Sequence, residues 1–126
     1  EYAARGDTTT LYWWGSDAAE AKANCFDCES RWAGNSTAPV GSFTANPFGL
    51  HDTAGNAEEW VQDCYHPNSR DAPGDGSAWV DGACEKRVVR GGHYRSTSGN
   101  LRSAKRGGTL PDSTLDTLGF RVVRQD

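Results

Sequence analysis

Glycine recurs along the whole of this chain and limits the kinds of structure that it can form. The 126 residues include 15 glycines and 5 prolines. Glycine weakens the interior of helices and strands, and proline interrupts them, so both residues favour turns and irregular loops. Only 36% of the residues are hydrophobic. We therefore expect at most one small domain, rich in loops and without long helices.

The charge of the chain excludes one large class of partners. The formal net charge is -4, from 13 Lys and Arg against 17 Asp and Glu, and the basic residues form no run. We therefore expect no nucleic-acid partner. The apolar stretches are only a few residues long, which also excludes a membrane span. The chain lacks methionine and opens with EYAAR, which resembles the end of a helix, so we expect an N-terminal part of the domain before residue 1.

Four cysteines form an even set in this loop-rich chain. They allow two disulfides by three pairings, of which the most local joins Cys25 with Cys28 and Cys64 with Cys84. The second bond would close a loop with little apolar content. The alternative is a zinc site made from all four thiolates, although such sites normally bring two closely spaced ligand pairs and only one C-x-x-C is present. Disulfides would favour an extracytoplasmic or cell-surface location.

Regular structure is expected in only a few short segments. A helix end stopped by glycine is predicted over residues 1–6, and an alanine-rich helical turn within residues 16–24. A short buried element is predicted around Trp60 and Val61. Residues 94–117 show no strong helical or strand period. Strands are predicted over residues 8–14, 40–43, 86–92 and 118–124, the last two in one small antiparallel sheet.

Several motifs in fixed order resemble the formylglycine-generating enzyme family, also called the sulfatase-modifying-factor domain. They are EYAARG, WWG, TAPVGSF, NPFGLHDTAGNAEEWVQDCY, RVVRGGHY, LRSAKR and PDSTLDTLGFRVVR, and they span essentially the whole chain. The resemblance implies an α+β, C-type-lectin-like fold, loop-rich with small antiparallel sheets. It also implies that residues 1–126 are the C-terminal part of a single domain, whose N-terminal remainder would be one partner of this chain.

The resemblance implies two kinds of metal chemistry, and this chain departs from both. The oxidising members hold copper with two cysteines shortly after an RVxxGGS motif, whereas residues 90–106 contain no cysteine and Ser96 stands at the first position. No copper is therefore expected. The members that resemble sulfoxide synthases need a histidine cluster for iron, but His51, His66 and His93 are isolated. A metal-dependent oxidase or sulfoxide synthase with its ligands in the N-terminal part is the alternative function.

A third branch of the family binds ligands. The tail of this chain resembles the variable proteins of diversity-generating retroelements, in which the last tens of residues form the ligand-facing surface. We therefore expect non-catalytic recognition of a protein or glycan ligand by residues 91–126, with solvated loop residues as the alternative for each position. The candidate binding residues combine an aromatic anchor with adaptable polar groups: Tyr94, Arg95, Ser96, Thr97, Lys105, Gly107, Thr109, Ser113, Thr114 and Asp116.

The resemblance also suggests roles away from the tail. Asn56 and Glu59 match a stretch that in the family helps to hold calcium, a hard cation that prefers oxygen ligands, so structural calcium is predicted here. The alternative is an asparagine in a turn beside an exposed glutamate. The arginines of the framework motifs are expected to make fixed hydrogen bonds. The tryptophans are expected to supply much of the buried area: Trp13, Trp14, Trp32, Trp60 and Trp79.

Overall fold

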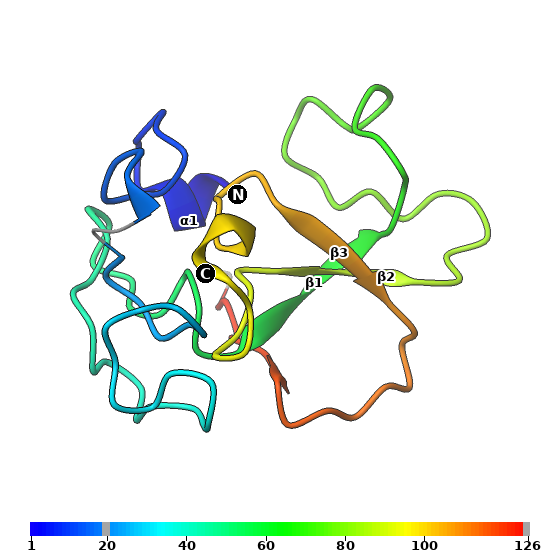
Figure 1. Cartoon of the computed structure of the whole chain (residues 1–126). Coiled ribbons are helices and arrows are strands. Elements are labelled where there is room, and N and C mark those ends of the chain that lie inside the picture. Colours follow the sequence, from blue (N-terminus) through cyan, green and yellow to red (C-terminus); the bar gives the residue numbers. More distant parts are fainter. Residues whose placement is uncertain (19–20, 125–126) are drawn as a thin grey trace.

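One four-stranded sheet organises the molecule, and loops make up most of the rest (Figure 1). The computed structural model describes residues 1–18 and 21–124. The spatial order of the strands is β3-β2-β1-β4; β1 pairs antiparallel with β2 and parallel with β4, and β3 pairs antiparallel with β2. The elements are α1 Tyr2–Arg5, β1 Glu58–Cys64, β2 Arg87–Arg90, the 3₁₀ turn η2 Ser98–Asn100, β3 Arg106–Thr109 and β4 Leu118–Gly119.

The two central strands are those that the sequence predicted. Trp60 of β1 lies opposite Val89 of β2, and both Val88 and Val89 are buried. The β1–β2 register shifts between Trp60 and Cys64. β-Branched and aromatic side chains pack well on a pleated surface. The predicted short element around Trp60 is confirmed as β1, although Trp60 and Val61 are half-buried, and the strand predicted within residues 86–92 is confirmed as β2.

β3 escaped prediction because two of its four residues are glycines. These glycines allow close packing. A Cβ atom on Gly107 would lie 3.0 Å from Cγ2 of Val89, and one on Gly108 would lie 2.5 Å from Cγ of the Tyr65 ring. The strand therefore depends on the absence of side chains, a signal that strand propensity does not detect.

The last predicted strand is shorter than expected and pairs with β1, not directly with β2. Only Leu118 and Gly119 pair with β1, in parallel, so the sheet is mixed and not purely antiparallel; β2 and β4 share it and run antiparallel to each other as predicted, with β1 between them. After Gly119 the chain turns to Arg121, whose guanidinium group binds Glu59 and the carbonyl oxygens of His51 and Asp52. These contacts replace strand pairing.

Two further strand predictions are wrong. Residues 8–14 form turns with a single isolated bridge between Tyr12 and Gly15, and residues 40–43 contain no strand. The helix end before Gly6 is confirmed, with Gly6 in the left-handed region at φ 58°. The helical turn predicted within residues 16–24 falls partly on residues 19–20, which lie outside the described residues, and residues 21–24 form no helix.

The core is small and lies beside the sheet. Tyr12, Ala23, Cys25, Ala54 and Leu101 form its buried cluster, and the Trp14 ring stacks on Tyr12 with centroids 4.8 Å apart. The five tryptophans are all half-buried, so none of them belongs to the fully buried cluster, although Trp14 packs against it. Trp79, for example, stacks on His66 with ring centroids 3.6 Å apart. The most fully buried side chains are smaller ones, including Leu101, Val88 and Val89 and the disulfide-bonded Cys25 and Cys64.

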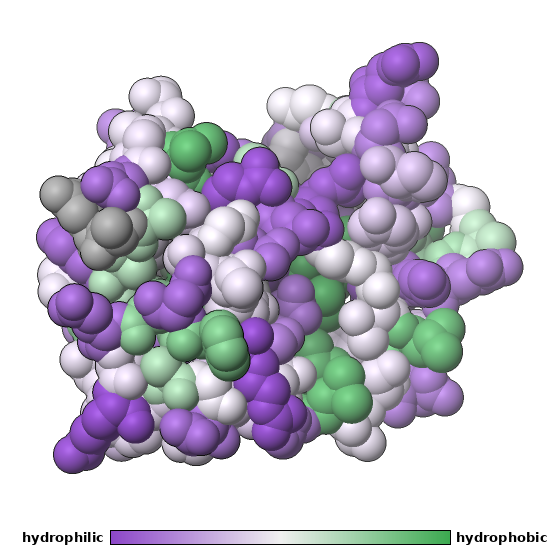
Figure 2. Space-filling view, viewed as in Figure 1, coloured by the Kyte–Doolittle hydropathy of each residue, from purple (hydrophilic) through white to green (hydrophobic). Residues whose placement is uncertain are grey.

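Both local disulfides are present. Cys25 is bonded to Cys28 and Cys64 to Cys84, as predicted, and none of the four cysteines is free for zinc. Such bonds persist in oxidising environments. Within the described residues, none of the helices has the length and apolar character needed to cross a membrane. On the face shown in Figure 2, apolar side chains form small groups separated by hydrophilic ones.

Candidate functional site

Asp116 contacts both Tyr94 and Arg95, although it lies in a different loop. The Tyr94 hydroxyl donates to Oδ2 of Asp116 at 3.0 Å. The Arg95 guanidinium donates to both carboxylate oxygens, at 3.2 and 3.0 Å, and its central carbon lies 4.9 Å from the centre of the Tyr94 ring. A bidentate arginine–carboxylate pair has a fixed geometry. The arrangement therefore presents one cation and one anion in defined positions at the surface.

Tyr94 is the fixed part of this arrangement, with only 3% of its surface exposed. Its backbone N–H donates to the carbonyl of Asn56 at 3.0 Å, and its carbonyl accepts from Gly34 N–H at 2.9 Å. Burial and the hydrogen bond to Asp116 raise the pKa of Tyr94, so the phenol stays protonated. Arg95 and Asp116, by contrast, are exposed and able to meet a ligand.

His93 and Ser96 shape the turn that carries Arg95. The backbone N–H of His93 donates to Oγ of Ser96 at 3.1 Å, and the N–H of Ser96 donates to the His93 carbonyl at 2.8 Å. The N–H of Arg95 contacts Nδ1 of His93 at 3.2 Å. Burial, together with the positive charge of Arg95, lowers the pKa of His93. The imidazole is therefore neutral near pH 7 and acts as an acceptor inside the turn.

The Cys25–Cys28 turn holds the same loop from the other side. Phe26 N–H donates to the Ser96 carbonyl at 2.8 Å, and the Asp27 carboxylate accepts from the Ser98 N–H at 2.7 Å and its hydroxyl at 2.9 Å. The hydrogen bond from the Ser98 backbone lowers the pKa of Asp27. Sequence reasoning missed this contact, since Asp27 and Ser98 lie 71 residues apart and no local pattern links them.

We call this group of neighbouring side chains the Tyr94 cluster. Phe26 adds an exposed aromatic ring to it, and Thr97 accepts a hydrogen bond from Asn100 at 3.0 Å. Its exposed surface combines an apolar ring with positive, negative and hydroxyl groups. The members of the cluster are Phe26, Asp27, His93, Tyr94, Arg95, Ser96, Thr97 and Asp116.

The other five predicted binding residues make no hydrogen bond to the Tyr94 cluster within the described part of the chain. Gly107 and Thr109 belong to β3, and Lys105 precedes that strand. Lys105 is close enough to Glu58 for its charge to lower the pKa of that carboxyl, although burial of Glu58 is the larger effect and raises it. Ser113 and Thr114 lie in the segment between β3 and β4. The Tyr94 cluster therefore contains half of the predicted binding residues, and ligand binding there stays a prediction.

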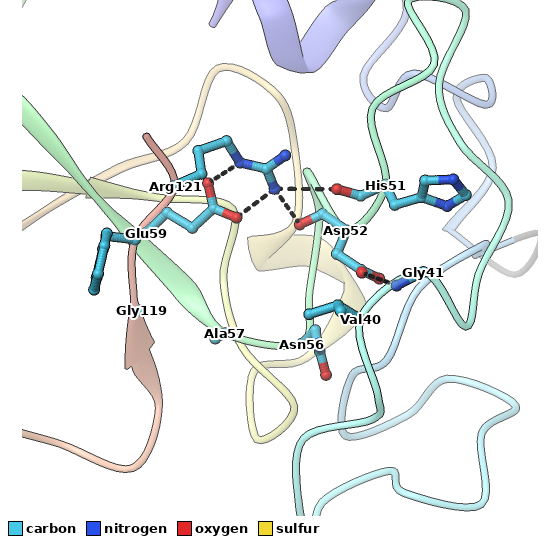
Figure 3. A pocket seen from close by; sticks show the side chains of 10 residues that line it. Val40, Gly41, His51, Asp52, Asn56, Ala57, Glu59, Gly119 and Arg121 are labelled. Atoms are coloured by element: carbon cyan, nitrogen blue, oxygen red, sulfur yellow. Dashed lines mark hydrogen bonds and ion pairs between the residues drawn. The ribbon is translucent and has the colours of Figure 1, made fainter. Parts of the chain in front are cut away.

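Asn56 and Glu59, the predicted calcium residues, line a cavity of about 530 Å³ (Figure 3). Asn56 is buried, and its Oδ1 accepts from the Ala38 N–H at 2.7 Å. Both oxygens of Glu59 are bound by Arg121. The side-chain oxygens of both residues thus already accept hydrogen bonds, and structural calcium at this position stays a prediction. Calcium binding would require Glu59 to leave Arg121, and a calcium titration followed by thermal unfolding would test it.

Asp52 completes the wall of this cavity without adding a free ligand. Its carboxylate accepts from the Gly41 N–H at 2.7 Å, and its backbone carbonyl accepts from Arg121. Asp52 and Asn56 both have positive φ, at 57° and 68°. Aspartate and asparagine tolerate the left-handed region better than other side chains. The cavity wall thus contains a network of hydrogen bonds among Asp52, Glu59 and Arg121.

This chain has no free thiol that could bind copper as in the oxidising members of the family. Among the described residues, Cys25, Asp27 and Cys28 form a group of potential metal ligands, but both sulfur atoms belong to a disulfide. Ser96, at the position implied for the first copper cysteine, instead accepts the hydrogen bond from His93. A copper ion held by two thiolates therefore does not fit the residues present.

The model of one protein family, the sulfatase-modifying factor enzyme 1-like domain, matches residues 1–126. The chain belongs to this family. The formylglycine-generating enzyme of Streptomyces coelicolor is 35% identical to it over 98% of the chain and 43% of the enzyme. The serine/threonine-protein kinase pkn1 of Chlamydia caviae is 35% identical over 98% of the chain and 19% of the kinase. The mouse protein named inactive C-alpha-formylglycine-generating enzyme 2 is 32% identical over 98% of the chain and 40% of that protein.

Solved structures of family type confirm the C-type-lectin-like fold. PvdO from Pseudomonas aeruginosa superposes with a TM-score of 0.84 and 35% identity, covering 94% of this chain and 47% of PvdO. Treponema denticola variable protein 1 superposes with a TM-score of 0.73 and 25% identity, covering 94% of this chain and 42% of that protein. The predicted resemblance to variable proteins is thus confirmed. The chain spans less than half the length of these relatives.

Proposed function

We propose that this chain is a non-catalytic recognition module that binds a protein or glycan ligand through the Tyr94 cluster. The observation that carries the proposal is the exposed Arg95–Asp116 pair held in place by buried Tyr94. Fixed charges beside an exposed aromatic ring offer directional contacts at low entropic cost. A family that includes a variable protein and a protein named inactive supports a binding role.

The ligand-binding segment is proposed to extend over residues 91–126, as in a variable protein of a diversity-generating retroelement. The framework motifs are RVVRGG, which ends at Gly92, followed by LRSA, PD and LGFRVV, and the positions between them are mainly small or polar. A reverse transcriptase gene and a near-identical template repeat beside the gene would support diversification. Without these two elements, the diversification claim fails while ligand binding by the Tyr94 cluster stands.

Selection from displayed libraries tests the binding role directly. We expect the wild-type chain, immobilised, to retain members of a phage-displayed peptide library or of a printed glycan array. Arg95→Ala should lose these ligands because the fixed cation is removed. Arg70→Ala, an exposed arginine in the loop after β1, is the matched control and should retain them. Equal retention by Arg95→Ala and the control would contradict the proposed site.

The location outside the cytoplasm is also a proposal. It rests on the two disulfides, which would be reduced in most cytosols. Labelling of intact cells with a membrane-impermeant reagent would test it. Protection of the protein from that reagent until the cells are lysed would argue against a cell-surface location.

The second candidate function is a metal-dependent oxidase or sulfoxide synthase. It is favoured by the 35% identity to the Streptomyces formylglycine-generating enzyme. Because all four cysteines here are in disulfides, the metal ligands would come from outside these residues. Oxygen consumption by the full-length protein with copper or iron and thiol peptides would establish this function. No consumption would remove it.

A further inference from the structure

The disulfide between Cys25 and Cys28 joins a fixed cysteine to a more exposed one. Cys25 is completely buried in the core cluster with Tyr12 and Leu101, whereas Cys28 is only half-buried. Thiol–disulfide exchange starts when a thiolate reaches one sulfur atom of the bond. Cys28 is therefore the cysteine that a reductant in solution reaches first, while Cys25 stays anchored in the core.

The turn that this disulfide closes has little other support. Within the described chain, residues 21–30 belong to no helix or strand. Inside the turn, the Cys28 N–H donates to the Cys25 carbonyl at 3.3 Å, which is long for a backbone hydrogen bond. A disulfide that closes so short a loop also constrains the unfolded chain less than one that closes a long loop. Opening this bond should therefore change the turn and leave the sheet folded.

Reduction would displace the turn rather than the core. Two unbonded sulfur atoms repel each other at covalent distance, so the two cysteines must separate when the bond opens. Because Cys25 is packed in the core cluster, most of the displacement falls on residues 26–28. The side chains and backbone of this short segment face the Tyr94 cluster, as the following contacts show.

Both residues between the cysteines hold the loop that carries Arg95. The Phe26 N–H donates to the Ser96 carbonyl at 2.8 Å. The Asp27 carboxylate accepts from Ser98 twice, from the N–H to Oδ1 at 2.7 Å and from the hydroxyl to Oδ2 at 2.9 Å. A displaced turn therefore weakens three hydrogen bonds to this loop at once.

Asp27 also offers a partner to the reduced sulfur atom. Sγ of Cys25 lies 3.3 Å from Oδ1 of Asp27, the same oxygen that accepts from the Ser98 N–H. A thiol can donate a hydrogen bond, whereas a disulfide sulfur has no proton to donate. The reduced Cys25 therefore competes with Ser98 for this oxygen. The negative carboxylate also disfavours a thiolate beside it, so Cys25 is held as the thiol.

We propose that Cys25 and Cys28 form a reversible thiol–disulfide site whose oxidation state regulates the Tyr94 cluster. Its effect on ligand binding rests on the function proposed above. The reductant is a dithiol, such as a protein with its own C-x-x-C pair. One thiolate of the reductant attacks Sγ of Cys28, the S–S bond breaks, and the Cys25 sulfur leaves and takes up a proton. The second thiol of the reductant then displaces Cys28, so the reductant becomes a disulfide and this chain gains two electrons and two protons.

Amide hydrogen exchange in graded ratios of reduced and oxidised dithiothreitol tests this site. Cys64→Ala with Cys84→Ala keeps only the bond of interest, and alkylation followed by mass spectrometry counts its free thiols. We expect reduction to speed exchange at the Phe26 and Ser98 amides about fivefold to tenfold, the effect of losing one hydrogen bond. The amides of β2 should keep their rates.

Two variants of the otherwise wild-type chain separate the contacts. Cys28→Ser opens the bond without a reductant and keeps the other disulfide, so it should show the fast exchange of the reduced state in oxidising buffer. Asp27→Ala removes the acceptor, so the Ser98 amide should exchange fast in both redox states. Asp71→Ala, at an exposed aspartate in the loop after β1, is the matched control and should respond to dithiothreitol as the wild type does.

Two results would overturn the redox site. The first is that a thiol at Cys28 becomes available to alkylation only under conditions in which the β2 amides also exchange, because the bond would then open only when the whole chain unfolds. The second is equal exchange at Phe26 and Ser98 in the oxidised chain, the reduced chain and Cys28→Ser.

Ligand binding separates this regulation from the recognition function itself. Ligands selected on the oxidised chain should be retained less by the reduced chain and by Cys28→Ser, because the loop that presents Arg95 is no longer fixed. Equal retention by both redox states would overturn the regulation and leave the recognition function standing. A loop that responds to reduction in a chain that retains no ligand would support the redox site and remove the recognition function alone.

Discussion

At the scale of single residues, Asp116 is the hub of the proposed binding surface because it accepts from both Tyr94 and Arg95. The two bonds differ in context: Arg95 is exposed, where an ion pair contributes little, while Tyr94 is buried. We expect Asp116→Ala to lower the urea midpoint more than Arg95→Ala does, since it leaves the Tyr94 hydroxyl without an acceptor. Adding Tyr94→Phe to Asp116→Ala should recover part of the loss. Additive effects in this double-mutant cycle would contradict the coupling.

His93, which lies in the same loop as Arg95, should make the stability of the folded chain depend on pH. Its pKa in the folded chain lies below the ordinary value of 6.5 because of burial and Arg95. As the pH falls through about 6.5, the unfolded chain therefore binds a proton before the folded chain does, and stability decreases. Urea unfolding at several pH values should show this decrease in wild type, and His93→Gln should reduce it. His51→Gln serves as the control, and an identical pH profile for wild type and His93→Gln would contradict the assignment.

At the scale of elements, the sequence predicts a strand well when side chains create it. Val88 and Val89 mark β2, and Trp60 marks β1. The sequence predicts a strand poorly where backbone geometry or a contact with a distant residue determines whether the strand forms. Thr8–Trp14 has strand-forming residues but forms turns, because Tyr12 packs into the core against Trp14 rather than joining the sheet. Residues 120–124 also include strand-forming side chains, but the chain leaves β1 after Gly119 and brings Arg121 to Glu59.

β3 provides an element-scale prediction because its glycines are in contact with neighbouring side chains. Gly108→Ala would place a Cβ atom 2.5 Å from the Tyr65 ring at its root, so the ring and the strand must shift. We expect destabilisation of about 1–3 kcal/mol, as for other overpacked sites. Gly74→Ala is the matched control, since a Cβ atom there meets nothing within 4 Å. Equal urea midpoints for the two variants would contradict this prediction, because they would show that β3 accommodates the added Cβ atom without loss of stability.

At the scale of the whole molecule, contacts between distant loops build the proposed site. The motifs around Tyr94 and Asp116 pointed to a binding surface, but the Asp27–Ser98 contact joins segments 71 residues apart. Patterns in a single sequence carry local information. They therefore indicate candidate residues but do not show which distant residues contact them in the folded chain. Family resemblance supplied the fold, and the folded chain shows that about half of the candidate residues share one surface.

The Cys64–Cys84 disulfide gives the last prediction, because it closes a long loop that has few other attachments. Trp79 stacks on His66, and its backbone carbonyl accepts from the Cys64 N–H at 2.7 Å, but most of residues 67–83 are exposed. Closing a loop of this length contributes about 3 kcal/mol by reducing the entropy of the unfolded chain. Cys64→Ala with Cys84→Ala should therefore lower the free energy of unfolding by about that amount and speed amide exchange over residues 65–83. Mass spectrometry that finds four free thiols in the native protein would contradict this account, because the loop would then be held by the Trp79 contacts alone.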